Sequence, residues 1–141
     1  KVTLAVNYSY IKSYKYVLAE GEEPTEAVDS NDFATLPRFR GNVSAQWERG
    51  NWTVRLTNRH IAGYDQAFAT ALPQQTRIGS SDFQDLFVRY GGFKNLSLTA
   101  SVTNLRDAIP PYDGAFGNRY STSLYDLKGR YVSLGASYSF K

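Results

Sequence analysis

The sequence predicts an all-β fold of about six antiparallel strands, and three observations lead to this prediction. Apolar and polar side chains alternate with a period of two over stretches of about ten residues, the pattern of strands with one apolar and one polar face. The links between these stretches are alternately short and long. No stretch shows a convincing helical period, so we expect no helix.

Each predicted strand shows the alternation in its own residues. Apolar side chains fall at alternate positions in six stretches: residues 2–10, 39–47, 52–56, 86–90, 96–102 and 132–140. Ser, Thr, Asn, Gln and Arg occupy most of the positions between them. The fourth stretch is the least regular, because Phe87 stands between Asp85 and Arg89 at a position that should be polar.

The links predict how the ends of the sheet differ. Residues 48–51 and 91–95 are short and contain Gly and Asn, which accept the positive φ of tight hairpin turns. The other three links are long and irregular, roughly residues 18–36, 65–81 and 107–129. Because short and long links alternate strictly, we expect all tight turns at one end of the sheet and all long loops at the other.

Length and composition exclude several classes of protein. The chain has 141 residues, the size of one ordinary domain, and has no Cys for a disulfide, a thiolate metal site or a nucleophile. The Lys and Arg behind its net charge of +3 are scattered, so nucleic-acid binding has little support. The sequence contains no apolar run of about 18 residues, so we expect no membrane-spanning helix. The chain begins at Lys1 within a strand pattern and has no signal peptide, so we expect a piece of a longer protein.

Three features favour a lipid bilayer as the medium that the apolar face meets. The polar face carries the residue types expected of strands that line a wet lumen. The apolar stretches span about nine to eleven residues, the length that crosses a bilayer when tilted. Aromatic residues gather at the ends of the apolar face, as in a membrane-interface girdle: Trp47, Trp52, Tyr90, Phe93, Tyr138 and Phe140. A soluble sandwich whose aromatic residues cap its hairpins is the alternative.

A sheet in lipid has to close on itself. Each unpaired backbone group at an open edge would cost several kcal/mol, because lipid offers no hydrogen-bond partner. Spanning barrels start at about eight strands. The sequence therefore predicts about six transmembrane strands of a larger barrel, whose other strands are missing or lie on another chain.

The last third of the chain resembles one known family. The segment VTNLRD at residues 102–107, followed by PPY at 110–112, resembles the penultimate strand and following loop of TonB-dependent outer-membrane receptors. The segment YDLKGRY at 125–131, followed by LGASYSF at 134–140, is similar to the last strand of that family. PRFR at 37–40 and Trp52 fit the same pattern more loosely.

The resemblance implies that residues 1–141 are the C-terminal portion of a barrel of about 22 strands, without its plug domain and earlier strands. Such receptors lie in the outer membrane of Gram-negative bacteria and take up a scarce nutrient: siderophore-bound iron, cobalamin, haem or a glycan. The implied partners are the lipid bilayer, the plug domain, the nutrient ligand, and TonB, which acts on an N-terminal box that this chain lacks. The tight turns would then be periplasmic and the long links extracellular.

The end of the chain resembles the signal that the barrel-assembly machinery reads. Tyr138 and Phe140 match its aromatic pattern, but Lys141 follows Phe140, whereas the aromatic residue usually comes last. An ordinary place in the aromatic girdle is the alternative role for both residues.

Candidate binding residues lie on the polar face and in the long links. We expect Arg38, Arg40 and Arg59 to present bidentate donors to an anionic substrate or to acidic groups of the plug. The alternative is that they pair with carboxylates such as Asp85 and Glu48. Aromatic residues of the long links would either cover a ligand or pack the loops: Tyr64, Phe68, Tyr112, Phe116 and Tyr120.

Nothing in the sequence predicts an enzyme, a metal site or a cofactor. His60 is the only His, so no two-His metal site can form, and its place near the outer end of the apolar face suggests an interfacial residue. No carboxylate has a plausible base or nucleophile partner in the sequence. We therefore predict part of a transporter. The alternatives are a soluble all-β binding or adhesion module and a passive porin-like barrel without a plug.

Overall fold

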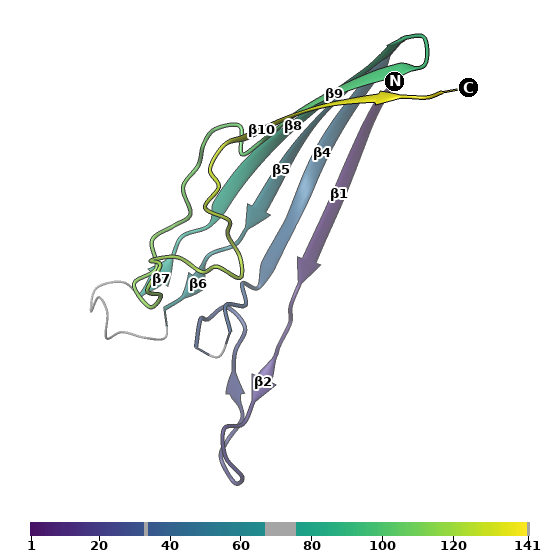
Figure 1. Cartoon of the computed structure of the whole chain (residues 1–141). Coiled ribbons are helices and arrows are strands. Elements are labelled where there is room, and N and C mark those ends of the chain that lie inside the picture. The colour runs from purple at the N-terminus through teal and green to yellow at the C-terminus, as the bar shows by residue number, and fades with distance from the viewer. Residues whose placement is uncertain (33, 67–75, 141) are drawn as a thin grey trace.

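The structure is a computed structural model that describes residues 1–32, 34–66 and 76–140. Six long strands form one antiparallel sheet: β1 (Val2–Tyr10), β4 (Phe39–Arg49), β5 (Trp52–Ile61), β8 (Ser81–Phe93), β9 (Leu96–Thr103) and β10 (Tyr131–Tyr138). They lie in the order β1-β4-β5-β8-β9-β10, so each long strand pairs with the next one in the sequence (Figure 1). The predicted all-β fold of six antiparallel strands is confirmed.

The two ends of the sheet differ as the link lengths predicted (Figure 1). Tight turns join β4 to β5 and β8 to β9, and Gly50 (φ 56°) and Asn95 (φ 60°) take the left-handed conformation there. We call this the turn end. Three long links lie at the opposite, loop end: the first link (residues 11–38), the second link (62–80) and the third link (104–130).

The first two links contain short strand pairs that the sequence did not predict. In the first link, β2 (Lys15–Tyr16) pairs with β3 (Thr25–Glu26). In the second link, β6 (Tyr64–Asp65) pairs with β7 (Arg77–Ile78). Pairs of two residues show no alternation, so no periodic signal marks them in the sequence.

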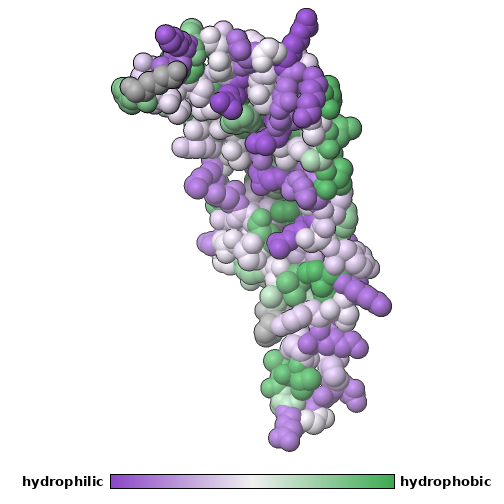
Figure 2. Space-filling model, turned by 90° about the vertical axis from the view of Figure 1, so that its right-hand side faces the viewer, coloured by the Kyte–Doolittle hydropathy of each residue, from purple (hydrophilic) through white to green (hydrophobic). Residues whose placement is uncertain are grey.

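The register of the sheet separates an apolar face from a polar face. On the apolar face, Val54 lies opposite both Trp47 and Val88, and Leu134 lies opposite Ala100. No second layer covers this face within the described residues, since Leu134 is 80% exposed. Figure 2 shows hydrophobic residues gathered along one margin of the upper part of the molecule. A soluble sandwich would bury such a surface, whereas strands that face lipid expose it.

Aromatic rings pack together on the apolar face at the turn end. The Trp52 and Tyr90 rings are 4.6 Å apart between centroids, and Tyr90 meets Phe93 edge-on at 5.2 Å. Tyr138 and Phe140 form a further pair at 4.8 Å, with Phe140 two residues beyond the end of β10. The predicted concentration of aromatic residues at this end is therefore present in the structure.

Near the loop end, the apolar face carries polar residues instead of apolar ones. The carboxylate of Asp82 accepts a hydrogen bond from the Asn58 amide at 2.8 Å and lies 3.1 Å from Nδ1 of His60. The Gln84 amide donates to Asn58 at 2.6 Å. These polar residues still pair β5 with β8, so the hydrogen-bonded ladder extends beyond the apolar residues. As a result β8 begins at Ser81, earlier than the predicted stretch at 86–90.

The buried core lies among the loops rather than behind the sheet. Its apolar members come from all three links and from β8: Ala27, Val28, Tyr64, Ile78, Phe83 and Tyr125. Buried polar residues accompany them: Asn31, Thr35, Asn104, Asp113 and Ser121. In the described part of the chain, no helix has the length and apolar character needed to span a membrane.

Candidate functional site at the loop end of the polar face

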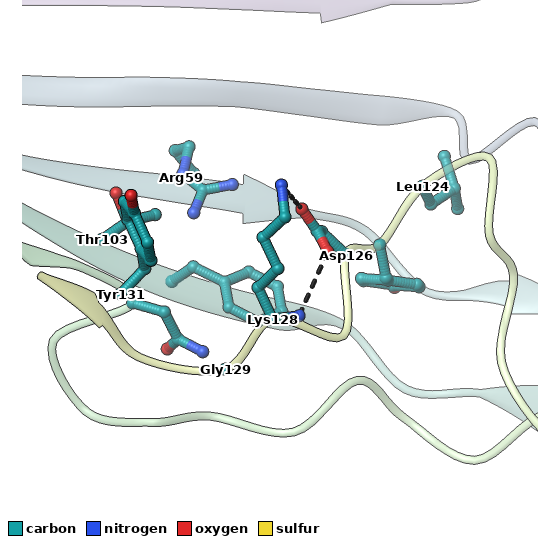
Figure 3. A pocket seen from close by; sticks show the side chains of 10 residues that line it. Arg59, Thr103, Leu124, Asp126, Lys128, Gly129 and Tyr131 are labelled. Carbon is teal, nitrogen blue, oxygen red and sulfur yellow. Dashed lines mark hydrogen bonds and ion pairs between the residues drawn. The ribbon is translucent and has the colours of Figure 1, made fainter.

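A cavity of about 360 Å³ opens where the third link folds over the polar face of the sheet (Figure 3). Arg59 on β5, Phe83 on β8 and Thr103 at the end of β9 form its strand side. The third link forms the other side through Leu124, Tyr125, Asp126, Lys128 and Gly129. The cavity is thus built from groups that the strand order and one loop bring together, and it faces the same end of the sheet as all three long links.

The base of the third link is closed by the segment that carries the family resemblance. Asn104 takes φ 54°, and its side chain accepts a hydrogen bond from the Ala108 N–H and donates one to the Ala108 carbonyl, both at 2.9 Å. Asp107 accepts a hydrogen bond from the Arg130 N–H at 2.8 Å, so it joins the two ends of the link. Gly129 (φ +64°) passes close to this carboxylate, and a Cβ there would lie 2.9 Å from Oδ1 of Asp107.

The cations that line the cavity each have a carboxylate partner. Arg59 binds Asp85 through two hydrogen bonds, Nε to Oδ2 at 2.7 Å and Nη2 to Oδ1 at 3.2 Å. The Lys128 ammonium lies 3.3 Å from Asp126, whose carboxylate also accepts the Lys128 N–H at 3.1 Å (Figure 3). That backbone hydrogen bond lowers the pKa of Asp126. The cavity therefore offers N–H donors without a large net charge.

Aromatic side chains form the floor of the cavity. The rings of Phe83 and Tyr125 are 6.0 Å apart, and both residues are buried. The Arg59 guanidinium lies 5.5 Å from the centre of the Phe83 ring, within the range of a cation–π contact. Burial raises the pKa of Tyr125, so its phenol stays protonated at neutral pH. The site thus combines aromatic rings with N–H donors, a combination that suits the binding of a ligand.

The three predicted arginines do not meet at one place. Arg59 lines the cavity, as described above. Arg38 lies just before β4, and its guanidinium donates to the carbonyl of Lys12 at 3.0 Å. Arg40 is exposed on the polar face of β4, opposite Ser9 of β1.

The predicted aromatic residues also separate. Tyr64 is completely buried, and its hydroxyl donates to Asp113 at 2.9 Å. Burial raises the pKa of this phenol well above its usual range. Tyr112 is 43% exposed, and its hydroxyl accepts a hydrogen bond from Arg119 at 3.2 Å. Phe116 and Tyr120 are half-buried in the third link, whereas Phe68 lies outside the described residues.

The sequence did not predict that Phe83, Tyr125 and Lys128 would line one cavity. Phe83 did leave a signal, because it is an aromatic residue at a polar-face position of β8. Tyr125 and Lys128 belong to the segment that carries the resemblance, but nothing in the sequence placed that segment over β5 and β8. Among the described residues, no group of three or more His, Cys, Asp or Glu side chains is placed to hold a metal ion.

A comparison with protein families matches residues 1–105 to the family described as "TonB dependent receptor-like, beta-barrel". The match covers β1 to β9 and ends where the third link begins. No curated protein and no solved structure matches the chain. The matched segment covers well over half of the 141 residues and contains five of the six long strands of the sheet. The chain therefore belongs to the TonB-dependent receptor-like β-barrel family.

Proposed function

We propose that the chain forms the C-terminal strands of an outer-membrane receptor that imports a scarce nutrient by TonB-coupled transport. The family match supports the receptor class. The bare apolar face supports contact with lipid. In this arrangement the apolar face meets the bilayer of a Gram-negative outer membrane, and the polar face lines the lumen beside a plug domain supplied by another part of the protein.

The proposed orientation puts the loop end outside the cell and the turn end in the periplasm. Single-chain outer-membrane barrels have short periplasmic turns and longer extracellular loops. The turns between β4 and β5 and between β8 and β9 are tight, and the three links at the other end are long. The cavity beside Arg59 would then lie at the outer mouth of the lumen, where an arriving ligand first meets the barrel wall.

One observation carries the nutrient-binding part of this proposal, namely the cavity formed between the third link and the polar face. Its aromatic floor and its N–H donors, Arg59 and Lys128, suit a ligand with flat apolar parts and oxygen acceptors. The proposed classes are siderophore-bound iron, cobalamin, haem and glycans. Arg38, Arg40 and Tyr112 remain proposals as further ligand contacts. The fourth predicted contact, Tyr64, could reach a ligand only if the links moved apart, because its side chain is completely buried.

Uptake by the full-length receptor tests the proposal. A strain that lacks the receptor gene is complemented, and uptake of each labelled nutrient class is measured with TonB present and with TonB deleted. We expect saturable uptake of one class that stops without TonB. Uptake that rises linearly with concentration and ignores TonB would identify a passive porin-like barrel, and a monodisperse soluble fold without detergent would identify a soluble module.

Two substitutions locate the ligand contact. Lys128→Gln should raise the half-saturation concentration for uptake about tenfold, the size of one lost charged hydrogen bond, while maximal uptake is retained. Arg49→Gln is the matched control, since Arg49 is an exposed cation at the turn end. Equal effects of the two substitutions would exclude the cavity as a ligand contact.

The terminal aromatic residues carry a separate proposal. Tyr138 and Phe140 would serve as the signal for the barrel-assembly machinery, and their ring contact at 4.8 Å holds them together at the end of β10. Phe140→Ala should reduce the amount of receptor in the outer membrane, measured by membrane fractionation. Phe93→Ala, which removes another exposed ring at the turn end, is the control for a general girdle effect.

A further inference from the structure

A polar cluster interrupts the apolar face near the loop end. It consists of Asn58 and His60 on β5 and of Asp82 and Gln84 on β8, which lie directly opposite each other as His60 with Asp82 and Asn58 with Gln84. The side chain of Asp82 is 49% exposed and that of His60 is 28% exposed. Polar and ionisable side chains on a surface that meets lipid are costly, so such a cluster is a candidate site for a polar partner.

The cluster lies at the level where lipid headgroups would meet the barrel. Eight residues of β5 separate Trp52, in the aromatic group at the turn end, from His60. This distance is about 27 Å along the strand, or about 21 Å along the bilayer normal at a strand tilt of about 40°. The apolar band of a barrel is about 25 Å tall. With the Trp52 ring at one membrane interface, His60 and Asp82 therefore lie at the other.

The hydrogen bonds within the cluster leave two acceptors unused. The Asn58 amide and Nδ1 of His60 both contact Oδ1 of Asp82, at 2.8 and 3.1 Å. Within the described part of the chain, Oδ2 of Asp82 has no partner. Because a carboxylate only accepts, Nδ1 of His60 carries the hydrogen, and Nε2 of the neutral ring is a second acceptor. The cluster therefore calls for a partner that supplies N–H or O–H donors.

Charge and aromatic surface select the kind of donor. None of the Lys and Arg side chains that the structure describes forms an ion pair with Asp82, so this carboxylate repels a phosphate and attracts a cation. The Phe39 ring lies 5.8 Å from the His60 ring between centroids, and Tyr8 stacks on Phe39 at 4.7 Å. A carboxylate beside aromatic rings suits an ammonium group, which has three N–H donors for the unused acceptors.

We propose that the polar cluster binds the primary ammonium headgroup of a lipid in the outer leaflet. The inference rests on one part of the proposed function, namely that the apolar face meets lipid and that the loop end lies outside. The ammonium donates to Oδ2 of Asp82 and to Nε2 of His60. Asn58 and Gln84 are positioning residues, since the Gln84 amide donates to Asn58 at 2.6 Å and the Asn58 amide in turn holds Asp82.

Lipid retention by the full-length receptor tests the proposal. The receptor is reconstituted into vesicles of phosphatidylethanolamine, phosphatidylcholine and glucosyl diacylglycerol in equal amounts. The lipids that stay bound after mild extraction are counted by native mass spectrometry. All three lipids have no net charge, but phosphatidylcholine has a cation without N–H donors, and the glucosyl lipid has O–H donors without a cation. We expect phosphatidylethanolamine to be retained about fivefold to tenfold above the other two, the size of a charged hydrogen bond at a partly exposed site.

Two variants connect this preference to the cluster. Asp82→Asn keeps the shape of the side chain but removes its charge, and it should abolish the preference. Glu48→Gln is the matched control, because it neutralises a carboxylate on the opposite face of the sheet, and it should retain the preference. If Asp82→Asn prevents folding, Phe39→Leu decides. It removes the ring beside His60, keeps an apolar side chain, and should reduce the preference about twofold to threefold.

A carbodiimide locates the contact on the chain. The reagent joins a carboxylate to a primary amine as an amide and takes up the water that is lost, so phosphatidylethanolamine in contact with Asp82 becomes attached there. Peptide mass spectrometry should find the lipid on the peptide that contains Asp82. Attachment only at other carboxylates would overturn the proposed site.

The outcomes also separate this inference from the proposed function. Equal retention of phosphatidylethanolamine and phosphatidylcholine, or a preference for the glucosyl lipid, would overturn the ammonium site. A second copy of the receptor that is retained in place of lipid and is lost in Asp82→Asn would overturn it as well. A receptor that inserts into vesicles without any headgroup preference contradicts the inference alone. A receptor that does not float with the vesicles contradicts the membrane assignment itself.

Discussion

Arg59 on β5 and Asp85 on β8 form a two-point ion pair across the polar face, with N–O distances of 2.7 and 3.2 Å. The same carboxylate accepts the Asn104 N–H at 2.9 Å, just past the end of β9. The pair therefore ties three consecutive strands at the rim of the cavity. The sequence was compatible with two roles for Arg59, contact with a ligand and pairing with a carboxylate such as Asp85. The structure shows the pairing with Asp85.

The first prediction concerns the energy of this pair. Arg59→Met and Asp85→Asn should show a coupling energy of about 1 kcal/mol, because both side chains are partly exposed and the solvent screens their charges. The measurement is a double-mutant cycle on the urea unfolding of the full-length receptor in lipid. Arg55→Met is the matched control, since the Arg55 guanidinium lies over the Phe87 ring at 5.2 Å. Equal coupling of Arg55 and Arg59 to Asp85 would contradict the prediction.

The second prediction compares the two faces of the sheet. Leu134→Arg, or Leu98→Arg, should destabilise the barrel by about 2–4 kcal/mol, because the charge would enter hydrocarbon. Thr99→Arg, on the polar face of the same hairpin, should have little effect. Unfolding in bilayers measures both. Equal tolerance at the two faces would mean that lipid does not cover the apolar face.

The sheet was predictable because its signals are local. Alternation fixes which residues of a strand share a face, and Gly and Asn mark the turns, so strand order and register follow. The predicted bounds of the strands were less accurate near the loop end, where the apolar face carries polar residues. Asn58, Asp82 and Gln84 are polar residues on the apolar face, so the alternation near them gives no strand signal although the hydrogen-bonded ladder continues.

The loop end was not predictable in the same way. Asp113 meets Asn31 and Tyr64 across 82 and 49 residues of sequence, and no period or spacing connects them. An aromatic residue in a loop, such as Tyr64, is equally compatible with ligand contact and with packing. Only the fold distinguishes these roles, because it shows whether the ring faces the solvent or the other links.

The third prediction concerns a close approach between β1 and β4. Gly41 lies opposite Tyr8, whose ring stacks on Phe39 at 4.7 Å between centroids. A Cβ at Gly41 would overlap the Tyr8 ring and the carbonyl oxygen of Asn7. Gly41→Ala should therefore cost about 1–3 kcal/mol, the usual penalty of overpacking. Gly91→Ala is the control in the same unfolding assay, since nothing lies within 4 Å of its added Cβ.

The last prediction is a pH dependence in the first link. Glu26 accepts hydrogen bonds from the Ser13 hydroxyl and from the N–H groups of Tyr14 and Val28, and these bonds lower its pKa from 4.5 to about 2. Because the folded pKa is the lower one, the stabilisation is complete above pH 4.5 and is lost as the pH falls toward 2. Hydrogen exchange, corrected for intrinsic rates, should show protection of Tyr14 and Val28 falling across this range. Glu26→Gln should show low protection already at pH 7, whereas the exposed control Glu22→Gln should follow the wild type. Parallel pH profiles for Glu26→Gln and the wild type would show that another group titrates.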